Sequence, residues 1–163
     1  MKLFIFFGLP GAGKTFSAKV AEKYFSYHLY DGDQDLTLEM QKAIQSQSVI
    51  TDDMRDIFFD NLIESAKVLL SRYEKIIIHQ TFIKEKYRKQ FLKEIPNAQF
   101  ILIETQQYLR EKRLRNRKEF PIEENYAKKM KGIFEKPHIS HKTIKNNFNG
   151  EENIRRQLEK ILT

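Results

Sequence analysis

Residues 8–15 read Gly-Leu-Pro-Gly-Ala-Gly-Lys-Thr and directly follow the apolar run of residues 3–7. Glycines allow backbone angles that bring N–H groups close to phosphate oxygens. The lysine can place a cation on the β- and γ-phosphates, and the threonine can offer a hydroxyl to Mg²⁺. A helix that begins near Thr15 directs its positive end at the same anion. The segment therefore predicts a phosphate-binding loop for a nucleoside triphosphate.

The alternative is a glycine-rich turn followed by a chance Lys-Thr pair. Three of the six glycines of the chain fall within residues 8–13, directly after an apolar run, and this context favours the phosphate loop. We expect the nucleotide to be bound by Gly8, Gly11, Ala12, Gly13, Lys14, Thr15 and Phe16.

Composition limits the classes of protein that this chain can belong to. Its 163 residues are 40% hydrophobic, enough for the core of one domain. The lack of cysteine excludes disulfides, thiolate metal sites and cysteine nucleophiles, and is consistent with a reducing cytoplasm. No apolar run approaches the roughly 18 residues that span a bilayer. We expect a cytoplasmic protein, a monomer or homodimer, with no membrane partner.

The net charge of +7 comes from the second half of the chain. Residues 84–163 carry 20 Lys and Arg against 11 Asp and Glu. A basic half can indicate a nucleic-acid partner. The alternative is a solvated surface with arginines that meet nucleotide phosphates. The lysines are dispersed, with no run of five or six, and this favours the second interpretation.

Apolar runs alternate with helical patterns along the chain. Strands are expected at residues 2–7, 27–30, 75–79, 99–103 and, more weakly, 143–145. Helices are expected at residues 15–25, 33–45, 52–72, 83–94, 106–117, 122–134 and 151–162. Continuously apolar strands separated by helices indicate a parallel sheet covered on both faces. We therefore expect a three-layer α/β phosphate-loop fold over residues 1–163, with ligands at the carboxyl ends of the strands.

Two carboxylates follow the second expected strand, in the sequence Asp31-Gly32-Asp33. From a tight bend both can reach one cleft, where Asp31 can hold Mg²⁺ and Asp33 can accept a proton from a hydroxyl. The alternative is an Asp-Gly turn in which Asp33 caps the next helix. The position after strand two of a phosphate-loop chain favours the first interpretation.

The third expected strand ends at His79-Gln80-Thr81. A strand-end aspartate that holds Mg²⁺ is usual in phosphate-loop proteins and is missing here, so Asp31 is the candidate to replace it. A partly buried imidazole with a hydrogen-bond partner is the favoured interpretation of His79. Gln80 or Thr81 can contact the metal or a substrate.

A basic segment follows the fourth expected strand. Arg113 and Arg117 are four residues apart and share a helix face. The planar guanidinium suits phosphate, so both are candidates to meet the nucleotide, within a lid near residues 113–125 that excludes water. The alternative is a basic surface that complements the helix dipole.

The chain resembles the small phosphate-loop kinases of the gluconate kinase and shikimate kinase type, and gluconate kinase most closely. Beyond the phosphate loop and Asp-Gly-Asp, the resemblance rests on segments 51–55, 84–88, 113–120 and 134–137. It implies ATP and Mg²⁺ as cofactors. It also implies that Arg113 and Arg117 stabilise the transferring phosphate, that Asp33 serves the acceptor hydroxyl, and that Arg55, Lys84 and Arg88 hold an anionic group on the acceptor.

The chain departs from the gluconate kinase pattern at Met54, Glu85 and Glu119, which stand where that family has Asp, Arg and His. We expect these positions to surround the acceptor, so the resemblance supports ATP more firmly than gluconate. The leading hypothesis is an ATP-dependent kinase for a small, anionic metabolite. The alternatives are a kinase for a nucleotide, nucleoside or polynucleotide 5′-hydroxyl, and a nucleotide-binding protein without catalysis.

Overall fold

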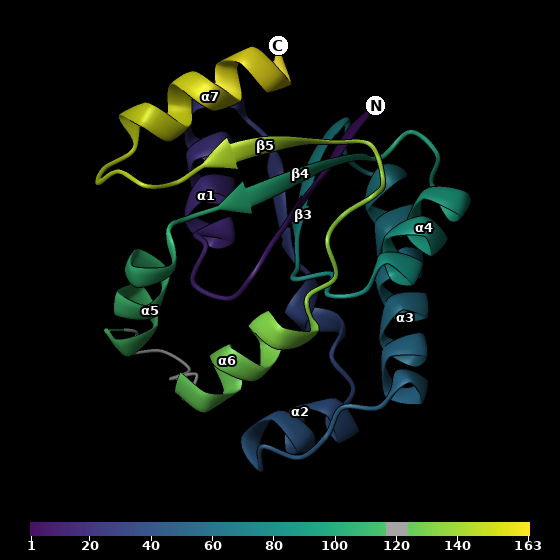
Figure 1. The fold of residues 1–163 in the computed structure, drawn as a ribbon. Helices are drawn as coiled ribbons and strands as arrows, with labels where there is room; N and C mark the ends of the chain where they lie inside the picture. The colour runs from purple at the N-terminus through teal and green to yellow at the C-terminus, as the bar shows by residue number, and fades with distance from the viewer. Residues whose placement is uncertain (117–123) are drawn as a thin grey trace.

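The computed structural model describes residues 1–116 and 124–163, which form a five-stranded parallel sheet in the order β2-β3-β1-β4-β5 (Figure 1). This confirms the expected α/β phosphate-loop architecture. The phosphate loop follows the central strand β1, with β3 and β4 as its neighbours. The strands are β1 (Lys2–Phe7), β2 (His28–Asp31), β3 (Lys75–His79), β4 (Gln99–Glu104) and β5 (His141–Lys145).

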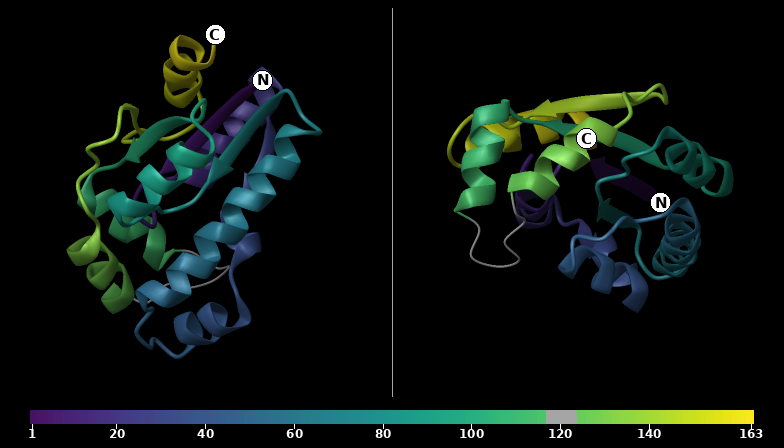
Figure 2. Two further views of the ribbon diagram at one scale, coloured as in Figure 1. Left: turned by 90° about the vertical axis from the view of Figure 1, so that its right-hand side faces the viewer. Right: turned by 60° about the horizontal axis from the view of Figure 1, so that its bottom comes forward.

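The helices cover both faces of the sheet. The helices expected at residues 15–25, 52–72, 83–94, 106–117 and 151–162 are present, with bounds that differ by at most two residues. The helical elements are α1 (Lys14–Phe25), the 3₁₀ helix η1 (Gly32–Asp35), α2 (Leu38–Gln45), α3 (Asp52–Leu70), α4 (Glu85–Glu94), α5 (Gln107–Arg115), α6 (Glu124–Ile133) and α7 (Glu152–Leu162). Both termini lie at one end of the molecule, and α2, α5 and α6 lie at the other (Figure 1, Figure 2).

The alternation of side chains along β1 divides the core into two layers. Leu3, Ile5 and Phe7 pack with the buried faces of α3 and α4. Phe4 and Phe6 point to the opposite face and pack with α1 and α7. A strand buried on both faces can be apolar at every position, which is why residues 3–7 carry no polar residue.

The prediction of one helix over residues 33–45 is wrong, because the helical structure is interrupted between Asp35 and Leu38. The Asp31 carboxylate accepts a hydrogen bond from the backbone N–H of Asp33 at 2.9 Å and begins the short helix η1. The Thr37 hydroxyl then accepts from the N–H of Met40 at 3.1 Å and caps a new helix, α2. The break keeps Asp31 and Asp33 at the carboxyl edge of the sheet.

Two expectations concern residues outside the described parts of the chain. Arg117 lies there, as does most of the expected lid near residues 113–125. Among the helices of the described residues, none combines the length and apolar character that a membrane span requires.

Candidate active site at the carboxyl edge of the sheet

The phosphate loop joins β1 to α1 and has glycines where its backbone turns sharply. Gly8, Gly11 and Gly13 have φ angles of 144°, 79° and 92°. Side-chain-bearing residues rarely take such angles, so the glycines permit this path. The N–H of Ala12 donates to the carbonyl of Leu9 at 3.2 Å and tightens the loop. The helix α1 begins at Lys14, so its N-terminus faces the loop.

Asn146, which sequence reasoning missed, supports the phosphate loop from the end of β5. Its side chain is 3% exposed and donates from Nδ2 to the carbonyl of Ala12 at 3.0 Å. Its own N–H donates to the carbonyl of Glu104 at 2.7 Å, which ties it to β4. The signal in the sequence was a polar residue directly after a strand, at the edge where ligands bind.

A methyl group at Gly13 is expected to weaken ATP binding by about 10-fold or more. A Cβ built there would lie 2.0 Å from Nδ2 of Asn146, and the φ of 92° costs an L-residue about 1–2 kcal/mol. Calorimetric titration of Gly13→Ala with a non-hydrolysable ATP analogue measures the effect. Gly132→Ala is the control, since nothing lies within 4 Å of a Cβ at Gly132. Equal affinity in Gly13→Ala and wild type would contradict this role of the glycine.

Lys14 and Thr15 extend from the first turn of α1. The ammonium group of Lys14 donates to the carbonyls of Gly8 at 2.9 Å and Leu9 at 3.0 Å, so its charge lies against the loop. The Thr15 hydroxyl lies 3.5 Å from Nδ1 of His79. Phe16 is exposed, with 39% of its surface accessible. The predicted cation and hydroxyl are therefore both at the carboxyl edge.

His79 and Asp31 lie beside Thr15, because β3 pairs with β2 in a register that places His79 opposite Asp31. Nδ1 of His79 is 4.0 Å from a carboxylate oxygen of Asp31. His79 is 6% exposed, and this burial lowers the pKa of its imidazole, which favours the neutral form. Thr15 and Asp31 thus offer hard oxygen donors next to the loop, a donor set that fits Mg²⁺ when nucleotide phosphates supply further ligands.

Asp33 lies in η1, two residues after Asp31, and its side chain contacts Gln80, the residue that follows β3. One of its carboxylate oxygens accepts from Nε2 of Gln80 at 2.9 Å. The expected pair of carboxylates is therefore present at one edge of the sheet, with distinct neighbours. Asp31 faces His79 and the phosphate loop, whereas Asp33 faces Gln80.

Arg113 lies beside the phosphate loop and is held by the ends of two strands. Its guanidinium donates to the hydroxyl of Thr105 at 3.2 Å and to the carbonyl of Asn146 at 3.1 Å. Partial burial lowers its pKa from the ordinary arginine value. Its Nη1 would lie 3.8 Å from a Cβ built at Gly13, so the guanidinium is next to the phosphate loop.

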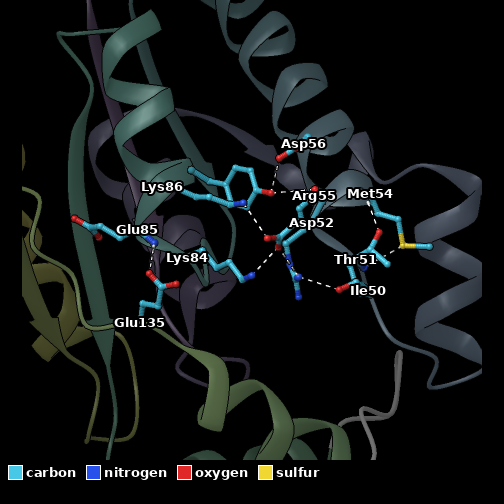
Figure 3. Close-up of polar contacts among 11 residues, drawn as sticks. Ile50, Thr51, Asp52, Met54, Arg55, Asp56, Lys84, Glu85, Lys86 and Glu135 are labelled. Carbon is cyan, nitrogen blue, oxygen red and sulfur yellow. Dashed lines mark hydrogen bonds and ion pairs between the residues drawn. The ribbon is translucent and has the colours of Figure 1, made fainter.

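Arg55 and Lys84 meet around Asp52 at the N-termini of α3 and α4 (Figure 3). Asp52 is 2.6 Å from the ammonium of Lys84, 3.0 Å from that of Lys86 and 3.5 Å from the guanidinium of Arg55. Hydrogen bonds from Lys84 and Lys86 lower the pKa of Asp52 to about 2. Three cations thus surround one carboxylate, and the cluster carries a positive excess.

Arg88, predicted as an acceptor-binding residue, has a structural position instead. Its side chain is 0% exposed, and its guanidinium donates to the carbonyls of Phe82, Ile83 and Glu135. It also forms an ion pair of 2.7 Å with Glu85. Four hydrogen bonds from this guanidinium therefore go to acceptors inside the protein, which is the pattern of a structural residue. Arg88 fastens α4 to the segment that precedes β5.

Two departures from the gluconate kinase pattern also have structural explanations. Glu85 accepts hydrogen bonds from the N–H groups of His138 and Ile139 and pairs with Arg88. The sulfur of Met54 accepts from the N–H of Thr51 at 3.4 Å within the cap of α3. Both residues therefore have structural partners, and their proximity to the acceptor stays a prediction. Glu119 lies outside the described residues.

Comparison with known proteins places this geometry among phosphate-loop domains. The model of a family described as "AAA domain" matches residues 3–137. A comparison with curated protein sequences gave no match.

Several solved structures of small kinases share the fold over nearly the whole chain. A sugar kinase from Janibacter sp. HTCC2649 has a TM-score of 0.86 at 16% identity, covering 99% of this chain and 94% of its own. A gluconokinase from Sinorhizobium meliloti 1021 has a TM-score of 0.79 at 17% identity, covering 96% and 88%. An APS kinase from Mycobacterium tuberculosis, in complex with AMPPNP and APS, has a TM-score of 0.70 at 16% identity, covering 99% and 95%. At these identities the likeness establishes the fold.

Proposed function

The chain belongs to the AAA domain family, and from this premise we propose that it is an ATP-dependent kinase that phosphorylates a hydroxyl group of a small, anionic metabolite. The observation that carries the proposal is the meeting of Lys14, Asp31 and Asp33 at one edge of the sheet. A carboxylate beside a loop that holds a triphosphate can act as a base toward the attacking nucleophile, which in a kinase is the hydroxyl of the acceptor.

The residues take complementary parts in the transfer. Backbone N–H groups of the loop and the Lys14 ammonium bind the β- and γ-phosphates and stabilise charge on the transferring group. Asp33 accepts the proton of the acceptor hydroxyl while that oxygen bonds to the γ-phosphorus and the bond to ADP breaks. Thr15 and Asp31 would hold Mg²⁺, which neutralises phosphate charge when bound. Arg113, and Arg117 beyond the described residues, would contribute further cations, within a lid that excludes water.

The acceptor is proposed to carry an anionic group that meets Arg55 and Lys84. The Arg55 guanidinium is anchored by the carbonyl of Ile50 at 2.9 Å, and its side chain is 11% exposed. A cation fixed in a partly dry site binds an anion more strongly than a mobile surface lysine does. A sugar acid has both the hydroxyl and the carboxylate that this arrangement would use. We further propose that the protein acts in the cytoplasm as a single domain.

Loss of the Arg55 or the Lys84 cation is expected to raise KM for the acceptor by about 10- to 100-fold. The reason is that each would make a charge-assisted hydrogen bond worth about 1.5–3 kcal/mol. The variants are Arg55→Gln and Lys84→Met, and KM for ATP should stay within about twofold. Lys67→Met is the control, because Lys67 is ion-paired to Glu64 and Glu94 near the opposite end of α3. An unchanged acceptor KM in both variants would remove this cluster from the acceptor site.

A screen of ADP release tests the proposed function. The purified protein is given ATP with sugar acids, shikimate-like acids, nucleosides or oligonucleotides. Turnover with a small hydroxy acid supports the proposal. Turnover with an oligonucleotide, together with oligonucleotide binding that weakens steeply as salt is raised, would instead identify a polynucleotide kinase. Tight ATP binding without turnover on any class would identify a nucleotide-binding protein that has no kinase activity.

A further inference from the structure

Gln80 connects the proposed base to the strand next to the phosphate loop. It follows β3 directly, and its side chain spans from β3 to η1. Its Nε2 donates to Oδ1 of Asp33 at 2.9 Å, and its Oε1 accepts from the backbone N–H of Thr81 at 2.7 Å. Both ends of the amide are therefore engaged, one by the backbone and one by the carboxylate.

The contact with Thr81 fixes which way the amide of Gln80 faces. A backbone N–H can only donate, so the atom of Gln80 that faces it must be the carbonyl oxygen. The NH₂ group is then directed at Asp33, whose Oδ1 accepts the hydrogen bond. The two contacts together make Gln80 a hydrogen-bond donor to Asp33.

The surrounding backbone leaves Gln80 little freedom. Its N–H donates to the carbonyl of Phe6 in β1 at 3.0 Å, and the carbonyl of Thr81 accepts from the N–H of Gly8 at 3.4 Å. A Cβ at Gly32 would lie 3.0 Å from Cβ of Gln80 and 3.1 Å from its Nε2. The glycine of Asp-Gly-Asp thus allows the bend to lie directly against Gln80.

Asp33 is consequently held at two points. Its N–H donates to the carboxylate of Asp31, and its Oδ1 accepts from Gln80. Gln80 is itself bonded to β1, and the next residue, Thr81, is bonded to Gly8 of the phosphate loop, so the position of the carboxylate is tied to that of the loop. In-line transfer depends on this relation, since the hydroxyl oxygen must meet the γ-phosphorus.

We propose that Gln80 is a positioning residue, which occupies Oδ1 of Asp33 and so reserves Oδ2 for the acceptor hydroxyl. This rests on the proposed function, in which Asp33 is the base. Loss of the donor lets the carboxylate rotate away from the hydroxyl, and a misplacement of about 1 Å can cost about 100-fold in rate.

Three variants separate positioning from packing. Gln80→Ala is expected to lower kcat by about 10- to 100-fold, with KM for ATP within about twofold. Gln80→Glu has the same shape, but places a second carboxylate against Asp33, so it is expected to lower kcat at least as much. Gln90→Ala is the matched control, because Gln90 donates to Asp60 at 2.8 Å in an equivalent exposed pair between α4 and α3.

An NMR measurement tests the hydrogen bond without reference to activity. The side-chain amide resonance of Gln80, assigned by its loss in Gln80→Glu, is expected to shift in Asp33→Ala and to stay unchanged in Asp60→Ala. An unshifted resonance, or a kcat near wild type in both Gln80 variants of an active enzyme, would overturn the positioning role. A wild-type protein that transfers no phosphate would overturn the proposed function, and with it the role of Gln80 in catalysis.

Discussion

Replacement of Lys14 with alanine is expected to lower the rate of phosphoryl transfer by about 10²- to 10³-fold, the cost of removing one preorganised group that stabilises transition-state charge. The Lys14 ammonium lies against the carbonyls of Gly8 and Leu9, on the loop where the β- and γ-phosphates are proposed to bind. The backbone N–H groups of the loop remain in the variant, so ATP binding should weaken less than turnover does. Single-turnover kinetics at saturating ATP measure the transfer step directly.

Lys160→Ala is a suitable control for Lys14→Ala. Lys160 is an exposed residue of α7, a helix that packs on the face of the sheet through its apolar side chains. Its loss should leave transfer within about twofold of wild type. A transfer rate in Lys14→Ala within about threefold of wild type would show that the lysine does not act on the transferring group.

Asp33→Asn is expected to lower kcat by about 10²- to 10⁴-fold, the range for loss of a general base. Asparagine keeps the shape of aspartate, and its carbonyl oxygen can still accept the hydrogen bond from Gln80. The variant therefore removes the ability to take a proton while preserving the local structure. Steady-state kinetics together with thermal unfolding distinguish a lost base from a lost fold.

Asp35→Asn provides the comparison within the same 3₁₀ helix. Asp35 accepts hydrogen bonds from the hydroxyls of Tyr30 at 3.0 Å and Ser65 at 2.8 Å, so its contacts join η1 to β2 and α3. Its replacement should lower stability and leave kcat near wild type. Near-normal turnover in Asp33→Asn would remove Asp33 from the role of base.

The phosphate loop and the sheet could be predicted because their determinants are local. Residues 3–7 are apolar at every position and lead into glycines whose φ angles permit the loop. The bounds of β1 and β3 agree with the sequence pattern, since both strands are buried on both faces. The break between η1 and α2 was missed, because it depends on the Thr37 hydroxyl, which caps α2 by accepting from the N–H of Met40.

The buried position of Arg88 could not be predicted, because it depends on a contact with a residue distant in the sequence as well as on local ones. Arg88 and Glu85 form a short-range pair, but Glu135 and Ile139 approach them only once α4 packs beside the segment that leads to β5. In a sequence, an arginine in a basic helix looks the same whether it faces a ligand or the core. Asn146 was missed for the same reason, since Ala12 is 134 residues away.

The most direct test of kinase activity follows the phosphoryl group itself. ATP labelled with ¹⁸O on the γ-phosphate is incubated with the wild-type protein and the acceptor that releases most ADP, and the products are analysed by mass spectrometry. The label is expected in a phosphoester of the acceptor, and this product should form at least about 100-fold more slowly in Lys14→Ala and Asp33→Asn. Label found only in inorganic phosphate would contradict this expectation, because the protein would then hydrolyse ATP without transferring phosphate to a hydroxyl.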